Sequence, residues 1–201
     1  MAGAKANVNH IFLTGKIQVG KSTILRSILE DHPDWQLKGF FTKWIRRGPS
    51  NKAGLYIFPA DRETIFNVQD YLDNIDEDDC PLLDPDLLKS ENLLAEFSSD
   101  NYKKKCVHTE AFDLWGKKLL SDKKKADLII MDEIGIFEDG SKDFLKAVTT
   151  ILNGSTPVMG IVSARKGDVT YAVENSPNVE VIEVTKENRD KLRKDLIKKL
   201  K

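Results

Sequence analysis

The chain has 201 residues, 40% of them hydrophobic and 31% charged, and its formal net charge is −1. These values are typical of one soluble α/β domain with a sizeable core, and they offer no broad basic surface for nucleic acid. Residues 1–9 lack the apolar core of a signal peptide, and no apolar run approaches the length of a membrane span. We therefore expect a cytoplasmic monomer with no membrane partner, and nucleic acid is disfavoured as a partner.

The domain organisation is predicted to be simple. We expect residues 1–8 to form a disordered tail and residues 9–201 to form a single domain, because the sequence has no internal repeat and no Gly/Ser-rich linker. Cys80 and Cys106 lie far apart without the spacing of a redox or metal site, which favours free thiols in a reducing compartment.

An apolar strand at His10–Thr14 leads into the loop Gly15–Ser22, and a helix is predicted over Ser22–Glu30. A strand, a glycine-bounded loop ending in Lys-Ser, and a helix are together the context of a phosphate-binding loop. Gly15 permits a tight turn out of the strand, and Gly20 lets the backbone approach a phosphate closely. The alternative, an ordinary glycine-containing turn before a helix, is disfavoured by these flanking elements.

This loop supplies the groups that hold a nucleoside triphosphate. Its backbone N–H groups, with those of the first helical turn, surround an anion at the positive end of the helix dipole. Lys21 would reach the β- and γ-phosphates, and the Ser22 hydroxyl would ligate Mg²⁺. The predicted phosphate-binding residues are Gly15, Lys16, Ile17, Gln18, Val19, Gly20, Lys21, Ser22 and Thr23.

Three short strands are predicted next, at Gly39–Arg47, Gly54–Pro59 and Thr64–Val68. They suggest an antiparallel hairpin unit, about residues 39–69, inserted in a parallel core. Its aromatic and basic side chains could stack on and pair with a nucleotide or nucleic acid. Packing within a twisted hairpin is the favoured interpretation, because such pairs commonly stabilise antiparallel strands. The side chains concerned are Phe40, Phe41, Lys43, Trp44, Arg46 and Arg47.

The middle of the chain carries less functional signal. Asp70–Asp86 is acidic and is predicted as a surface loop, and Lys103–Lys105 as a solvated run. Leu87–Phe97 is predicted as a short helix, and Thr109–Ser121 as a longer one. The buried side of the longer helix is expected to carry Phe112, Trp115, Leu119 and Leu120.

A buried parallel strand at Asp127–Gly135 bears two carboxylates at its end, Asp132 and Glu133. The C-terminal ends of strands are where ligands bind in open α/β sheets. Asp132 fits the Mg²⁺ ligand of a Walker B strand. Glu133 fits the general base that orients and deprotonates the attacking water. Downstream of a phosphate loop this pair is a strong indication, because the mechanism needs both parts.

The helix Ser141–Leu152, capped by its first residue, precedes a buried strand at Val158–Val162. This strand is predicted to lie between the phosphate-loop strand and the carboxylate-bearing strand. Ser163 would then sit near the γ-phosphate as a polar sensor. Arg165 or Lys166 could supply positive charge to the transition state, as an arginine finger does in cis. For Arg165 a plain surface position is the alternative.

A strand at Val179–Val184 and a helix at Asn188–Leu200 complete the chain. The predicted fold is a three-layer α/β sandwich of the P-loop NTPase class. Its sheet is mostly parallel, with helices on both faces and the antiparallel hairpin unit added.

Four stretches, Gly15–Ser22, Gly39–Thr42, Asp132–Gly135 and Thr185–Asp190, carry a family likeness. With them the chain resembles, nearly end to end, the nucleoside-triphosphatase family of the thermophilic, cancer-related type. The resemblance implies a RecA-like strand order and hydrolysis of nucleoside triphosphates with broad base tolerance and low turnover. It also implies dependence on Mg²⁺.

The chain departs from the family pattern in two places. The family usually has proline and glycine inside the phosphate loop, where this chain has Lys16, Ile17 and Gln18. The family hairpin often carries arginine before a Gly-Phe pair, where this chain has Ala53 before Gly54 and Leu55. Lys16 adds a charge beside the phosphates that is either functional or merely exposed.

Three functions fit these observations. The leading hypothesis is Mg²⁺-dependent hydrolysis of ATP, GTP or other nucleoside triphosphates, with Glu133 activating water. A small-molecule or nucleotide kinase would use the same groups to activate a hydroxyl. A nucleotide-dependent switch would bind tightly and hydrolyse only with a partner.

Overall fold

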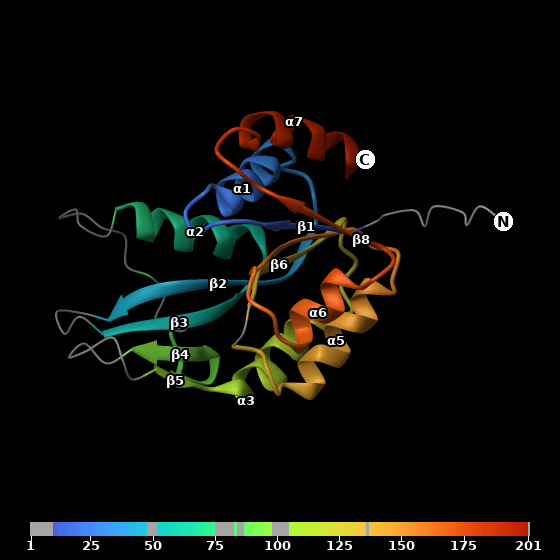
Figure 1. The fold of residues 1–201 in the computed structure, drawn as a ribbon. Coiled ribbons are helices and arrows are strands. Elements are labelled where there is room, and N and C mark those ends of the chain that lie inside the picture. Colours follow the sequence, from blue (N-terminus) through green and yellow to red (C-terminus); the bar gives the residue numbers. More distant parts are fainter. Residues whose placement is uncertain are drawn as a thin grey trace.

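An eight-stranded β-sheet runs through the computed structural model, which describes residues 10–47, 52–74, 83, 87–97, 105–135 and 137–200 (Figure 1). The strands are β1 (His10–Thr14), β2 (Leu37–Arg47), β3 (Lys52–Pro59), β4 (Leu93–Phe97), β5 (Lys105–Val107), β6 (Leu128–Ile134), β7 (Val158–Val162) and β8 (Val179–Glu183). Their order across the sheet is β5-β4-β3-β2-β6-β7-β1-β8. Neighbouring strands pair in parallel along β2-β6-β7-β1-β8. On the other side of β2, the strands β2, β3, β4 and β5 pair antiparallel as a meander. The predicted fold class and the predicted place of β7 are therefore confirmed.

Helices cover both faces of this sheet (Figure 1). One face is covered by α1 (Lys21–Asp31), α2 (Arg62–Asp73) and α7 (Arg189–Lys199). The other is covered by a helical segment made of α3 (Thr109–Ala111), the π-helical η4 (Phe112–Gly116) and α4 (Lys117–Leu120), and by α5 (Lys142–Leu152) and α6 (Asp168–Glu174). No helix among these described residues is both long and apolar enough to cross a membrane.

The sheet separates the hydrophobic core into two clusters, and β1 contributes to both because its side chains alternate between the two faces. Ile11 and Leu13 pack in the cluster that includes α1, α2 and α7. Phe12 packs in the opposite cluster, with Phe112 and Phe144. All of these side chains are almost fully buried, so the strand before the phosphate loop is fixed from both sides.

The prediction of a strand at Thr64–Val68 is wrong, because these residues belong to α2. The Asp61 carboxylate accepts a hydrogen bond from the Thr64 N–H at 2.9 Å, which caps the helix. Ile65 and Val68, three residues apart, are its buried side chains. Helical spacing and a capping aspartate therefore decide the structure of this segment.

The predicted helix at Leu87–Phe97 is also wrong. A 3-10 turn, η3 (Ser90–Asn92), precedes β4, which pairs with β3. Leu93, Leu94 and Ala95 are consecutive and buried, as expected for a strand covered on both faces. The meander thus continues through β4 and β5, beyond the predicted limit at residue 69.

Two further segments qualify the predictions. Asp70–Asp73 closes α2, whereas residues 75–82 and 84–86 of the predicted acidic loop lie outside the described residues, as do residues 1–8, Cys80, Lys103 and Lys104. The helix predicted at Thr109–Ser121 is present over residues 109–120, with Phe112 and Leu120 buried and Trp115 and Leu119 packed against the core. Cys106 is a free, exposed thiol.

Ser141 stands at the N-cap of α5, as predicted, but its hydroxyl does not cap the helix. It donates instead to the Thr109 carbonyl at 3.0 Å. The Asp113 carboxylate accepts from the Phe144 N–H at 3.0 Å and takes over the capping role from a neighbouring helical segment. Helix α5, which follows β6, is thereby tied to the segment over residues 109–120.

The aromatic side chains of β2 serve the core, as the favoured interpretation predicted. Phe40 packs edge-on against Phe144, with ring centroids 5.5 Å apart, and Phe41 stacks on Phe58 at 5.2 Å. Both are buried, whereas 38% of Trp44 is exposed. The Arg46 and Arg47 side chains lie outside the described part of the structure.

Candidate functional site

The predicted site residues gather at one edge of the sheet. Parallel pairing aligns Asp132 of β6 with Ile161 of β7, and Leu13 of β1 with both Ile161 and Ile182 of β8. The four strands therefore end at the same level, and the residues that follow them meet there.

The loop after β1 has the backbone that its glycines predict. Gly15 has φ +135°, and a Cβ atom there would stand 2.5 Å from the Val184 carbonyl oxygen, so no side chain fits. Gly20, the N-cap of α1, has φ +109°. The Lys21 ammonium donates to the Gly15 and Lys16 carbonyls, both at 2.9 Å. These bonds hold the cation across the loop, at the N-terminus of an eleven-residue helix.

Side chains inside the loop mostly face solvent. Lys16 and Gln18 are exposed, and Ile17 is 89% exposed. Val19 is instead buried and packs in the core with α1. Thr23, in the first turn of α1, is exposed as well.

Ser22 and Asp132 meet at this edge. Both residues line the same small pocket, and Asp132 is almost fully buried. Burial raises the pKa of Asp132, and the charge of Lys43, the Ser22 hydroxyl and the charge of Lys21 oppose that rise. Two adjacent hard oxygen donors, one of them a carboxylate, fit Mg²⁺, which is bound through few protein ligands and substrate phosphates.

Glu133 follows Asp132 directly, and its side chain is open to solvent at the edge of the sheet. Its backbone N–H donates to the Thr42 hydroxyl of β2 at 3.3 Å. Desolvation by the surrounding protein raises the pKa of Glu133, and the neighbouring Asp132 carboxylate raises it further. A carboxylate made more basic in this way suits proton abstraction.

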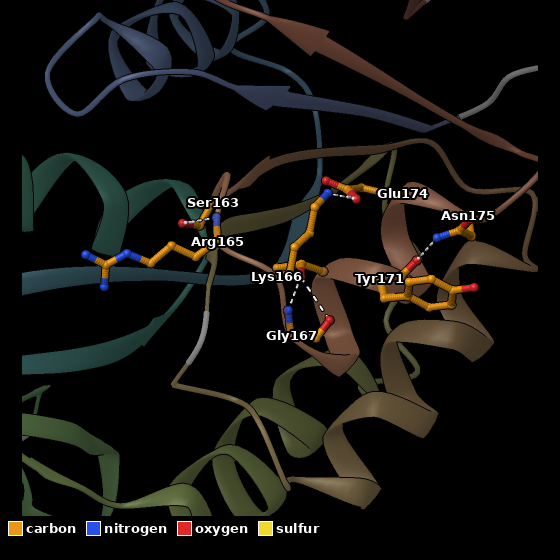
Figure 2. Close-up of polar contacts among 8 residues, drawn as sticks. Ser163, Arg165, Lys166, Gly167, Tyr171, Glu174 and Asn175 are labelled. Carbon is orange, nitrogen blue, oxygen red and sulfur yellow. Dashed lines mark hydrogen bonds and ion pairs between the residues drawn. The ribbon is translucent and has the colours of Figure 1, made fainter.

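The loop after β7 separates the two predicted cations (Figure 2). The Ser163 N–H donates to the Ile134 carbonyl at 2.7 Å, which ties this loop to the end of β6. Lys166 is turned toward Glu174 of α6 and forms an ion pair with it. The Arg165 side chain extends away from both, and its guanidinium has no hydrogen bond or ion pair within the described residues. Of the two, Arg165 is the available cation.

Sequence reasoning did not place three further residues at this edge, although it named Lys43 as a side chain that could pair with a nucleotide. Lys43 of β2 places its ammonium nitrogen 3.9 Å from Asp132 Oδ2. Glu138, only 2% exposed, accepts from the Gly135 N–H at 3.0 Å. Arg189, at the start of α7, lies with its Cδ atom 3.7 Å from where a Cβ of Gly20 would be.

The available signals for these residues differ. The stretch Thr185–Asp190 contained Arg189, but nothing in the sequence placed it over the phosphate loop. Lys43 becomes a neighbour of Asp132 only through the parallel pairing of β2 with β6, in which Phe41 aligns with Asp132. That pairing joins segments ninety-one positions apart, a separation shown by the Thr42–Glu133 hydrogen bond.

Comparison with known proteins decides the family. A protein-family model described as NTPase matches residues 10–74 and 85–197, which is most of the chain. The chain belongs to this NTPase family. The site residues described above all fall within the matched ranges.

Relatives of this NTPase family are similar along nearly their whole length. The nucleoside-triphosphatase THEP1 of Metallosphaera sedula is 25% identical over 203 residues, covering 98% of this chain and 89% of the relative. The human cancer-related nucleoside-triphosphatase is 28% identical over 210 residues, covering 94% of both.

Two solved structures share the fold. The crystal structure of THEP1 from Aquifex aeolicus superposes with a TM-score of 0.62 at 23% identity, covering 96% of this chain and 99% of the other. The solution structure of a human cancer-related nucleoside triphosphatase gives 0.63 at 21% identity, covering 94% and 96%. These likenesses confirm the P-loop NTPase-like architecture.

Proposed function

We propose that this protein hydrolyses nucleoside 5′-triphosphates to the diphosphate and phosphate, with Mg²⁺ and with broad tolerance of the base. One observation carries the proposal: the Lys21 loop, the neighbouring side chains of Ser22 and Asp132 and the carboxylate of Glu133 stand together at the end of the sheet. The names of the relatives support the same reaction class, since both are nucleoside-triphosphatases.

Each residue has a distinct proposed role. The loop N–H groups hold the phosphates, and Lys21 neutralises their charge. Ser22 and Asp132 would hold Mg²⁺, which supplies charge neutralisation at the β- and γ-phosphate oxygens when it is bound. Glu133 accepts the proton of the attacking water. Arg165 supplies positive charge to the transition state, as an arginine finger does in cis.

The hydrolysis proposal is tested with two variants. Lys21→Ala is expected to weaken binding of a fluorescent ATP analogue by at least about tenfold, because a phosphate loses its cationic partner. Glu133→Gln is expected to keep that affinity within about threefold and to lower the rate of phosphate release by roughly 10²-fold or more. Lys124→Ala, an exposed residue that precedes β6 at the opposite end of that strand from Asp132, serves as the control.

Phosphate release from ATP, GTP, CTP and UTP, with Mg²⁺ or with EDTA, measures the other two parts of the proposal. Similar rates for the four nucleotides and loss of release in EDTA are the expected results. An unchanged rate in Glu133→Gln overturns the assignment of the base. Transfer of labelled phosphate from ATP to an added nucleoside or nucleotide, in place of release to water, overturns hydrolysis in favour of a kinase.

A further inference from the structure

Lys43 is a cation of the site that the proposed reaction does not use. It lies on β2, and its ammonium reaches back to 3.9 Å from Asp132 Oδ2. Its side chain is 23% exposed, and that of Asp132 is 7% exposed. The pair is therefore largely removed from solvent, where a Coulomb interaction is screened less than on the surface.

Lys43 is the cation of its pocket that lies beside Asp132. The small pocket that it lines is bounded by Ser22 and Arg26 of α1, Gln69 of α2, and Asp132. Arg26 is engaged elsewhere, 3.6 Å from Asp73 and 4.0 Å from Glu30.

Gln69 is also engaged elsewhere, because it donates to Asp73 at 2.7 Å. Among the neighbouring charges, that of Lys43 lowers the pKa of Asp132 most, and it also lowers the pKa of Glu133. The ammonium thus stands beside the oxygen atoms that would ligate a metal.

We propose that Lys43 lowers the affinity of the Ser22–Asp132 pair for a free divalent cation, so that the metal enters together with the triphosphate. This inference rests on the proposed function. An ammonium at this ion-pair distance neutralises much of the field of one carboxylate and repels a divalent ion arriving there. A bound triphosphate would restore the missing negative charge and supply further oxygen ligands, so that metal binding would no longer depend on Asp132 alone.

The deciding experiment measures Mn²⁺ binding to the full chain without nucleotide, from the loss of the free-ion signal in electron paramagnetic resonance at pH 8. Lys43→Met is expected to bind Mn²⁺ at least about tenfold more tightly than the wild type, a small part of the attraction between charges 4 Å apart. Lys43→Arg, which keeps the charge, is expected to match the wild type. In the presence of ATP the difference between Met variant and wild type is expected to shrink.

Two controls tie the effect to the carboxylate. Lys38→Met removes a lysine of the same strand whose ammonium contacts the Asp122 carbonyl at 3.1 Å, and it is expected to change nothing. Adding Asp132→Asn to Lys43→Met is expected to abolish the gain in Mn²⁺ affinity. Circular dichroism establishes that each variant is folded, and Lys43→Gln replaces the Met variant if that one is not.

The outcomes separate this inference from the proposed function. Equal Mn²⁺ affinities of wild type and Lys43→Met overturn the role of Lys43, while nucleotide binding and hydrolysis by the wild type stand. Loss of binding of the fluorescent ATP analogue by Lys43→Met in EDTA also overturns it, because Lys43 is then a phosphate ligand. A wild type that neither binds nor hydrolyses nucleotides overturns the proposed function on its own evidence.

Discussion

Gln18 adopts a backbone conformation that side chains disfavour. It is the one residue other than glycine with a positive φ, +60°, among the described residues. A left-handed conformation costs a residue with a Cβ roughly 1–2 kcal/mol, whereas glycine adopts it freely. This chain therefore carries glutamine at a loop position whose backbone would suit glycine better.

Replacing Gln18 with glycine is expected to leave stability unchanged or to raise it by up to about 1 kcal/mol, because relief of strain exceeds the added freedom of the unfolded chain. Thermal unfolding followed by circular dichroism measures the effect, and the largest expected gain corresponds to a rise of roughly 2–4 °C. Gln18→Ala, which keeps a Cβ, is expected to show no gain. A glycine variant less stable than the alanine variant contradicts the strain argument.

Glu138 couples stability to pH. Burial raises its pKa to about 7 from the ordinary value of 4.5, so the folded chain retains a proton that the unfolded chain releases. The favourable contribution is complete below the unfolded pKa and is lost as the pH rises through 7. Glu138→Gln removes this dependence, since the amide can still accept from the Gly135 N–H.

The expected result is that the stability of the wild type relative to Glu138→Gln falls by roughly 3 kcal/mol between pH 4.5 and 8. Urea unfolding at a series of pH values measures the difference. Glu174→Gln, a substitution of the partner of Lys166, is the matched control and is not expected to follow the same profile. A difference that stays constant with pH contradicts the assignment.

At the scale of elements, α5 depends on a cap supplied by another helical segment. The Asp113 carboxylate of η4 accepts from the Phe144 N–H of α5. Asp113→Ala is expected to lower the free energy of unfolding by about 1 kcal/mol, and Asp113→Asn, which keeps an acceptor oxygen, by less. Urea unfolding curves of the two variants test this, and equal losses in both would contradict a capping role.

The elements show what local sequence can and cannot predict. The loop Gly15–Ser22 and the strand bearing Asp132 were predictable, because glycine spacing and a continuous apolar run are local signals. The strand prediction for Thr64–Val68 failed because a short apolar run fits a strand as well as a helix. The capping hydrogen bond at Asp61 favours the helix. The helix prediction over β4 failed because a strand buried on both faces lacks the alternation of apolar and polar residues that distinguishes a strand from a helix.

The candidate site was predictable where one strand or loop carries it. Asp132 and Glu133 follow the apolar run of their own strand, and Lys21 and Ser22 directly follow Gly20. Lys43 and Arg189 reach the same edge only through the arrangement of whole strands and helices. Which of Arg165 and Lys166 is available depended on Glu174, a residue of a helix that the sequence did not reveal.

At the scale of the whole molecule, β7 joins β1 to β6 in the sheet. A Cβ at Gly160 of β7 would stand 2.3 Å from Phe12 Cε1 and 2.9 Å from the Met131 carbonyl oxygen. Gly160→Ala is therefore expected to cost at least about 2 kcal/mol and to weaken nucleotide binding, because β1 and β6 are forced apart. Thermal unfolding measures the cost.

Gly135→Ala is the matched control, since a Cβ there meets its nearest atom only at 3.8 Å. It is expected to change the melting temperature much less. Equal losses in the two variants would contradict the claim that the close approach of Phe12 to β7 fixes the spacing of the sheet.

The strand order also has a consequence for synthesis on the ribosome. β1 emerges early, yet both strands that pair with it, β7 and β8, come near the end of the chain. At ordinary elongation rates the apolar run Ile11–Leu13 waits on the order of ten seconds before its neighbours exist. The phosphate loop, packed against Val184 and Arg189, can take its final shape only after those residues have left the exit tunnel. A nascent chain is therefore not expected to capture nucleotide before β8 and the start of α7 have emerged.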